Sequence, residues 1–270
     1  MSSSKAQSLP DISCIIVNYQ SVDILPACFS SFANISLPGS YEILVANNDV
    51  RERDALRALQ NRFQFSIIDL PENKGFSSAS NEAAKVARGR TLLFLNPDTR
   101  FLSGDFSSSL ASLSEGKVGV IGFRLLKERT LREAWSAGKE VTLFSLIANH
   151  FRPFSRPWQF FAEQSVDWVS GAAFLVLREL FVRLGGFDER FFLYYEDVDF
   201  CFRTREVGKT VLLSPTVSVL HIGGKSMRSV GYSHQKAAYY KSQEQYFHMH
   251  RPKYEEVILR LLHAVFCAHT

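Results

Sequence analysis

Residues 12–19, ISCIIVNY, form a nearly unbroken run of apolar and β-branched residues that ends in two polar ones. A strand that is buried on both faces, as in a parallel sheet, has this composition. The same form returns at 41–49, YEILVANND, at 63–70, FQFSIIDL, and at 91–99, TLLFLNPDT. Because helical stretches separate these runs, the order predicts an α/β fold with a mostly parallel sheet flanked by helices.

Further helix and strand signals extend this pattern along the chain. Residues 77–89, SSASNEAAKVARG, predict a helix that ends at Gly89 as its C-cap, and residues 117–123, KVGVIGF, predict another strand. Residues 127–164 are weakly patterned, and their length suggests an insertion or a functional loop. Regular patterning returns at 166–180, VDWVSGAAFLVLREL.

The chain is expected to divide into three segments. Residues 1–10 are polar and lack the apolar core of a signal peptide, so we expect a disordered lead. Residues 11–230 are expected to form one domain. Residues 231–270 predict a C-terminal helical extension, which Pro252 divides into two helices.

The composition is typical of a folded globular protein, with 46% hydrophobic and 21% charged residues. No segment has the ~20 consecutive apolar residues that a membrane-spanning helix needs, which favours a cytoplasmic protein. A net charge of +4 is too small to indicate a nucleic-acid partner. The cysteines are scattered without metal-ligand spacing, so we expect buried free thiols at Cys14, Cys28, Cys201 and Cys267.

Polar residues follow three of the expected strands directly. In sheets of this kind, ligands bind at the carboxyl ends of the strands. We therefore expect a binding site formed by Asn18, Tyr19, Asn47, Asn48, Asp49, Asn96 and Asp98.

The tripeptide Asn96-Pro97-Asp98 has two interpretations. A carboxylate at a strand end can supply an oxygen ligand to Mg²⁺ or Mn²⁺. Asn, Pro and Asp are also the residues that favour a simple turn without a ligand. From the tripeptide alone, both interpretations stay open.

Five blocks occur in one order within residues 11–230. They lie at 15–19, 72–81, 93–99, 167–203 and 219–224, and read IIVNY, ENKGFSSASN, LFLNPDT, DWVSGAAFLVLRELFVRLGGFDERFFLYYEDVDFCFR and VLHIGG. In sequence and in order they resemble the family 2 glycosyltransferases, and among them the bacterial rhamnosyltransferase-like members. The resemblance implies a GT-A-like fold, that of the nucleotide-diphospho-sugar transferases, with the C-terminal helices as an appendage.

The resemblance also implies a metal site. Asp98 corresponds to the last residue of a DXD-type motif, which holds a divalent cation, Mg²⁺ or Mn²⁺, against the diphosphate of the donor. His221 matches a histidine that related enzymes use as a further metal or diphosphate contact. A metal ion suits the reaction because it stabilises the charge of the departing diphosphate without a proton donor.

Three carboxylates stand within the aromatic stretch at 192–200, FLYYEDVDF. The resemblance implies that Asp197 is the catalytic base of a direct, inverting attack. Apolar neighbours and the charges of Glu196 and Asp199 could raise the pKa of Asp197. Alternatively, Glu196 and Asp199 could favour the start of a helix.

The remaining site residues are implied by the other blocks. Trp168, Ser170, Gly171 and Glu196 are expected to line the sugar and acceptor pocket, and Asn73, Gly75 and Asn81 to shape the nucleotide pocket. One departure is that VANND has Ala46 or Asn47 where the family usually has an aspartate that contacts the nucleotide base. Asp49 is a substitute after a small shift in register.

The implied partners are a nucleotide-diphosphate sugar, dTDP-rhamnose or a UDP-sugar, and a glycan or lipid-linked acceptor in bacterial surface polysaccharide (O-antigen) synthesis. The basic and aromatic segment at 149–161 and the tail at 257–268 would suit peripheral contact with the inner face of the cytoplasmic membrane, or simple packing. A catalytically silent relative that binds a nucleotide or glycan is the alternative. The sequence leaves the oligomeric state open.

Overall fold

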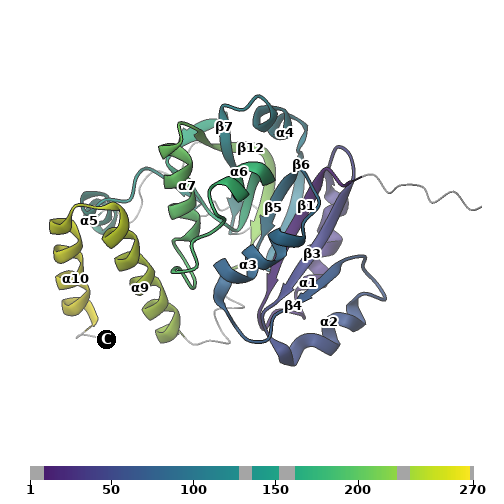
Figure 1. Cartoon of the computed structure of the whole chain (residues 1–270), viewed down its shortest axis with the longest axis horizontal. Helices are drawn as coiled ribbons and strands as arrows, with labels where there is room; N and C mark the ends of the chain where they lie inside the picture. Colours follow the sequence, from purple (N-terminus) through teal and green to yellow (C-terminus); the bar gives the residue numbers. More distant parts are fainter. Residues whose placement is uncertain (1–8, 128–135, 152–161, 224–231, 268–270) are drawn as a thin grey trace, which may run out of the picture.

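The computed structural model describes residues 9–127, 136–151, 162–223 and 232–267. Its centre is one large mixed sheet (Figure 1). In spatial order the strands are β2 (Ile35–Ser36), β6 (Thr99–Asp105), β12 (Thr210–His221), β7 (Val118–Leu126), β11 (Ala173–Leu177), β5 (Thr91–Leu95), β1 (Ile12–Asn18), β3 (Tyr41–Asn47) and β4 (Ser66–Asp69). In addition, β9 (Gln164–Val166) pairs with β12, and β8 (Ala137–Gly138) pairs with β10 (Trp168–Val169) in a small second sheet.

The four strands expected from the apolar runs are confirmed as a parallel group, β5-β1-β3-β4. Every residue of β1 is buried, and its side chains alternate between two clusters: Ile15 and Val17 face one side of the sheet, and Cys14 and Ile16 the other. Strand β11 runs antiparallel to β5 and β7. The sheet is therefore mostly parallel but mixed.

Helices cover both faces of the sheet (Figure 1). One face carries α3 (Gly75–Val86), α6 (Arg178–Arg183) and α7 (Glu196–Glu206). The other carries α1 (Leu25–Ser30), η1 (Ser31–Asn34), α2 (Arg53–Leu59), which follows η2 (Val50–Glu52), and α4 (Ser107–Ser114). On the first face Phe187 is the centre of a ring cluster with Phe94, Phe174, Phe181 and Phe200, at centroid distances of 4.9–5.7 Å.

The expected C-cap at Gly89 is wrong. Helix α3 ends at Val86, and its C-cap is Ala87 in an extended conformation. Gly89 instead lies against β1, where a Cβ atom would come within 2.4 Å of the Ser13 nitrogen. The glycine allows close approach to the neighbouring strand and does not turn the chain out of the helix.

A third hydrophobic cluster joins the C-terminal helices to the sheet domain. As expected, Pro252 separates two helices, α9 (Tyr232–His250) and α10 (Lys253–Cys267). Their residues Tyr246, Phe247 and Leu259 pack with Tyr195 and Val198 at the start of α7. Helix α5 (Leu143–Phe151) lies at the upper end of this pair (Figure 1).

Cys14, Cys28 and Cys201 are buried free thiols, as expected. Burial raises the pKa of Cys28 to about 12, so this thiol is inert at neutral pH. The side chain of Cys267 and the lead at 1–8 lie outside the described residues. Among the helices that the structure describes, none is both long enough and apolar enough to span a bilayer.

Candidate active site

Strand pairing brings Asp98 and His221 together. Strand β6 begins directly after Asp98, and its first residue, Thr99, is the register partner of His221 at the end of β12. The Asp98 carbonyl accepts a hydrogen bond of 3.1 Å from the Ile222 nitrogen. As a result, Asp98 Oδ1 lies 3.3 Å from His221 Nε2, and Asn96 Nδ2 lies 3.3 Å from the same nitrogen.

The Asn96-Pro97-Asp98 tripeptide is also a turn. The Asn96 carbonyl accepts hydrogen bonds from the backbone nitrogen of Thr99 at 3.1 Å and from its hydroxyl at 2.6 Å. The Asp98 side chain is not needed for these bonds. The two interpretations of the tripeptide are thus compatible, because the turn aims the carboxylate at His221.

Asp98 and His221 fit a divalent cation. Two neighbouring ligands of an octahedral ion, each at roughly 2.1 Å, lie about 3 Å apart, and the observed separation is 3.3 Å. Within the described residues there is no cluster of three or more His, Cys, Asp or Glu side chains suited to a metal. An ion held here would need further ligands, such as diphosphate oxygens and water.

Asp197 lies at the start of α7 and is partly exposed. Its Oδ2 accepts a 2.7 Å hydrogen bond from the Gly171 nitrogen, and its Oδ1 accepts one of 2.8 Å from Val198. Burial raises the pKa of Asp197, although these backbone donors act in the opposite direction. The result is a fixed carboxylate that takes up a proton more readily than an ordinary aspartate.

The backbone of residues 171–172 connects Asp197 with the end of β5. The Ala172 carbonyl accepts a 3.1 Å hydrogen bond from the Asn96 nitrogen, and the adjacent Gly171 nitrogen binds Asp197. Because β11 is antiparallel to β5, its beginning lies at the carboxyl end of β5. Asn96, Asp98, His221, Gly171 and Asp197 are therefore gathered at one edge of the sheet.

Tyr194 and Tyr195, just before Asp197, have an unusual backbone. Their φ angles are 71° and 69°, and the left-handed region is costly for aromatic residues. Burial, followed by the charges of Glu196 and Asp98, raises the pKa of Tyr194, so its phenol is within electrostatic reach of both carboxylates. A strained segment next to the proposed base indicates that its position is imposed by surrounding structure.

That structure is provided from two sides. From α3, the Ser77 hydroxyl donates a 2.6 Å bond to the Phe191 carbonyl, and the Phe76 nitrogen donates a 2.7 Å bond to Phe192. From α9, Ser242 donates a 2.8 Å bond to the Leu193 carbonyl, and Gln243 donates a 2.6 Å bond to the Tyr195 hydroxyl. The C-terminal helices are thus part of the framework that positions Asp197.

Gly75 gives a direct test of this framework. It has φ +82°, and a Cβ atom would lie 2.3 Å from the Phe192 carbonyl oxygen. We expect Gly75→Ala to lower the free energy of unfolding by about 2–4 kcal/mol, since backbone strain and the clash add. The matched control is Gly116→Ala, at φ +81°, where an added Cβ atom would have no described atom within 4 Å apart from those of its chain neighbours, and which should cost about 1 kcal/mol. Equal losses in urea unfolding would contradict close packing of Gly75 on the Phe192 segment.

As the alternative interpretation expected, α7 begins at Glu196, and Glu196 and Asp199 lie in its first turn, where a negative charge favours the helix start. The N-cap residue is Tyr195, and no side-chain hydrogen bond caps the helix. Asp199 is fully buried and pairs with Arg203, at 2.7 Å, and with His250 Nε2, also at 2.7 Å. Glu196 is 5% exposed, and its Oε2 has no hydrogen-bond partner among the residues that the structure describes. Burial, and then the charge of Asp197, raises the pKa of Glu196 well above its usual value.

The ends of β1 and β3 form a buried amide network. Asn18 Nδ2 donates to Asn47 Oδ1 at 3.2 Å and to Glu52 at 2.9 Å. Asn47 Nδ2 in turn donates a 2.8 Å bond to Asp69 at the end of β4. Tyr19, the residue after Asn18, is partly exposed. A carboxylate, Asp69, therefore remains next to Asn47 although the expected aspartate is missing.

Two further polar groups of this region are engaged locally. Asn48 donates to the Asn73 side chain at 2.8 Å and to the Gly75 carbonyl at 3.1 Å, so it ties β3 to the loop before α3. Asp49 is bound by the Arg51 guanidinium, whose hydrogen bonds lower the pKa of the Asp49 carboxyl. Asp49 is available to a ligand only if that ion pair opens.

Three further expected site residues, Asn81, Trp168 and Ser170, each make local hydrogen bonds. The Asn81 amide holds the Phe187 backbone through bonds of 2.8 and 2.9 Å, so it is engaged in packing α3. The Trp168 indole donates a 3.0 Å bond to the Lys139 carbonyl. Ser170, whose nitrogen bonds the Ser136 carbonyl at 2.9 Å, leads into Gly171. Of these three residues, Ser170 is next in the chain to the contact with Asp197.

Sequence reasoning did not identify Glu52, Asp69, Ser242 or Gln243. A sequence pattern could have identified Asp69, because it follows an apolar run in the same way as Asn47 and Asn96 do. No such pattern marks the other three, since their roles depend on contacts between segments far apart in the chain.

The chain is similar to known proteins along most of its length. Residues 13–184 match the glycosyl transferase family 2. The chain is 25% identical over 217 residues to the low-salt glycan biosynthesis hexosyltransferase Agl10 of Haloferax volcanii, covering 79% of this chain and 67% of that protein. It is 26% identical over 204 residues to the rhamnosyltransferase WbbL of Escherichia coli, covering 70% and 75%.

A solved structure shows the same fold. The mannosyltransferase PcManGT from Pyrobaculum calidifontis, in complex with GDP-Man and Mn²⁺, has a TM-score of 0.61 over 94% of this chain and 69% of its own, at 16% identity. At this identity the likeness concerns the fold alone. It confirms the expected GT-A architecture.

Proposed function

Since this chain belongs to glycosyltransferase family 2, we propose that it transfers a sugar, with inversion, from a nucleotide-diphosphate donor to a hydroxyl group of a glycan or lipid-linked glycan in the synthesis of a bacterial surface polysaccharide. The observation that carries the proposal is the arrangement at the sheet edge. Asp98 and His221 lie 3.3 Å apart, and the backbone of 171–172 links that edge to Asp197.

Asp197 is the base in this mechanism. Its partly exposed carboxylate takes the proton of the acceptor hydroxyl, whose oxygen forms a bond to the anomeric carbon while the bond from that carbon to the diphosphate oxygen breaks. A carboxylate with a raised pKa is better matched to this proton transfer than an ordinary aspartate. The Gly171 and Val198 nitrogens hold it in one orientation.

Asp98 and His221 would hold Mg²⁺ or Mn²⁺. When bound, such an ion stabilises the negative charge of the departing nucleoside diphosphate. Asp98 is only 7% exposed, so its carboxylate is already oriented toward His221 before any ligand arrives. PcManGT, whose fold this chain shares, was solved with Mn²⁺ and GDP-Man.

dTDP-rhamnose is the donor that we propose, with a UDP-sugar as the alternative. Support comes from the likeness to the rhamnosyltransferase WbbL. Asn18, Asn47 and Asp69 offer amide and carboxylate groups at the strand ends for the nucleotide base. Calorimetric titration with dTDP, UDP and GDP, with and without Mn²⁺, tests this choice. If a folded sample binds none of them, the proposal fails in favour of the catalytically silent relative.

Asp98→Asn is expected to weaken nucleotide binding in Mn²⁺ at least about tenfold, because a neutral amide is a poorer ligand for a hard cation than a carboxylate. Without Mn²⁺ the variant and the parent should bind alike. The control is Asp54→Asn, at a side chain that is 97% exposed on α2, which should bind as the parent does. Equal Mn²⁺ dependence in Asp98→Asn and the parent would exclude Asp98 as a ligand.

A further inference from the structure

A series of hydrogen bonds runs from α10 through α9 to the segment before Asp197. His263, toward the end of α10, has its Nε2 2.8 Å from Gln243 Oε1. The Nε2 of the same Gln243 amide donates a 2.6 Å bond to the Tyr195 hydroxyl. Tyr195 is the N-cap of α7 and stands two residues before Asp197. All three linked residues are only 4–8% exposed, and we call them the His263 network.

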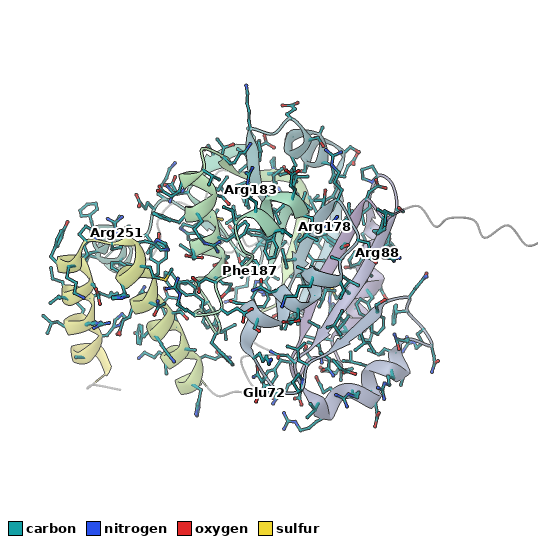
Figure 2. All side chains as sticks on the ribbon, viewed as in Figure 1. Glu72, Arg88, Arg178, Arg183, Phe187 and Arg251 are labelled. Atoms are coloured by element: carbon teal, nitrogen blue, oxygen red, sulfur yellow. The ribbon has the colours of Figure 1, made fainter. Side chains whose placement is uncertain are left out.

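The pairing of the two C-terminal helices places the His263 ring. Arg251, labelled in Figure 2 at the turn between α9 and α10, donates 2.8 Å bonds to Glu140, just before α5, and to Glu255 of α10. Beyond this turn the two helices lie side by side (Figure 1). The His263 ring packs on the Tyr240 ring of α9, with 4.3 Å between their centroids. Helix α9 therefore fixes the orientation of the imidazole.

Both nitrogens of the His263 ring face an oxygen atom. Nε2 faces Gln243 Oε1, and Nδ1 lies 2.8 Å from Glu244 Oε1. A neutral imidazole has one N–H group, so it can donate to one of these oxygens and turns a lone pair toward the other. The charged ring has two N–H groups and can donate to both. The geometry therefore fits His263 in its charged form.

The titratable groups near this ring in the described parts of α9 and α10 have both signs of charge. The carboxylate of Glu244 contacts the ring directly, and Arg260 Nε lies 3.7 Å from the other oxygen of that carboxylate. Lys236 lies 5.7 Å from the centroid of the Tyr240 ring, on which His263 packs. The two cations thus contact neighbours of His263, whereas the carboxylate that receives its Nδ1 proton contacts His263 itself.

The other end of the network holds a strained backbone. Tyr195 has φ 69°, which an aromatic residue keeps only where its surroundings enforce it. If the ring loses one proton, Nδ1 keeps the other, because a hydrogen bond to a carboxylate is stronger than one to an amide oxygen. Nε2 then has no proton for Gln243, so this bond breaks or the amide turns over. A turned amide presents its oxygen to Tyr195 and reverses the hydrogen bond that holds the phenol.

We propose that His263, in its charged form, is a positioning residue for Asp197 that acts through Gln243 and Tyr195. The charged ring fixes the amide, and the amide fixes the phenol. The phenol holds the left-handed residue from which α7 starts, with Asp197 in the first turn. The effect on sugar transfer rests on the proposed function. The hydrogen bonds do not, because they can be measured without donor or acceptor.

Nuclear magnetic resonance of the full chain tests the network without substrates. With ¹⁵N-labelled histidine and ¹³Cζ-labelled tyrosine, the two residues are assigned from the signals lost in His263→Phe and Tyr195→Phe. We expect both ring nitrogens of His263 to carry protons at neutral pH. The Cζ signal of Tyr195 should shift over the same pH range in which His263 loses a proton. In Gln243→Leu, which has a similar size and no amide, the Tyr195 signal should no longer follow His263.

Transfer assays measure the effect on the reaction. His263→Phe keeps an aromatic ring on Tyr240 and removes both N–H groups. We expect kcat to fall about fivefold, the effect of one hydrogen bond, with the donor KM and nucleotide affinity unchanged. In the parent, kcat should fall as rising pH removes the second ring proton. His263→Gln, whose uncharged amide stays a donor at every pH, should restore most of kcat and remove this alkaline fall.

His248→Gln is the matched control. His248 of α9 also faces a carboxylate, with Nδ1 3.2 Å from Glu256 Oε1, but this contact leads to α10 and not to Tyr195. The variant should keep the parent's kcat and alkaline fall, with folding of all variants checked by thermal unfolding. A neutral His263 at neutral pH, a Tyr195 signal that does not follow it, or unchanged kcat in His263→Phe would each overturn the proposal. Linked titrations without detectable transferase activity would leave the network standing and count against the proposed function alone.

Discussion

Asp197→Asn is expected to lower the rate of sugar transfer by about 10²–10⁴-fold while leaving nucleotide affinity unchanged. The amide has nearly the same shape, and its single oxygen can accept one of the two hydrogen bonds that Gly171 and Val198 donate to the two carboxylate oxygens. It cannot take up the proton of the acceptor hydroxyl, and general base catalysis contributes a factor of this size. Transfer assays under saturating donor, beside calorimetric titration of the nucleotide, measure the two quantities separately.

The pH dependence gives a second readout of the same residue. Burial raises the pKa of Asp197, and a general base acts only when it is ionised. Activity should therefore be low in acid and rise through a pKa above the ordinary range of an aspartate. The acid limb of kcat/KM should disappear in Asp197→Asn. The control variant Asp54→Asn, at an almost fully exposed side chain, should keep the rate and the limb, and retained turnover in Asp197→Asn would exclude it as the base.

The sequence predicts much of the fold because β1, β3, β4 and β5 are local apolar runs, and their parallel pairing puts their polar ends at one edge. The contact between Asp98 and His221 could not be derived in this way. It depends on the pairing of β12 with β6. Strand β6 begins within the turn after Asp98, and its residues alternate between buried and exposed.

The direction in which a side chain points is a second feature that could not be predicted from the sequence. The pattern at 77–89 indicates that Asn81 is helical, but periodicity does not reveal that its amide binds the Phe187 backbone. The left-handed backbone of Tyr194 and Tyr195 was equally hidden, because aromatic residues rarely adopt it without support from elsewhere. That support comes from α9, which sequence reasoning treated as an appendage.

Asp199→Ala is expected to lower the free energy of unfolding by about 3 kcal/mol, which is at the lower end of the range for removing one partner of a buried ion pair. Asp199 is fully buried, and its loss leaves Arg203 and His250 without their shared carboxylate. The loss stays at the lower end because Arg203 still donates to the carbonyls of Leu184 and Gly186, at 2.7 and 2.9 Å. Urea unfolding followed by circular dichroism measures the change.

A double-mutant cycle with His250→Ala separates the two partners of Asp199. Because His250 is on α9 and Asp199 on α7, their 2.7 Å contact ties the C-terminal helices to the turn that holds Asp197. His250→Ala should cost less than Asp199→Ala, since the pair with Arg203 remains, and the cycle should give a coupling of about 1 kcal/mol or more. Additive losses would mean that Asp199 stabilises the fold through Arg203 alone. In that case α9 would support the segment before Asp197 only through Ser242, Gln243 and the third cluster.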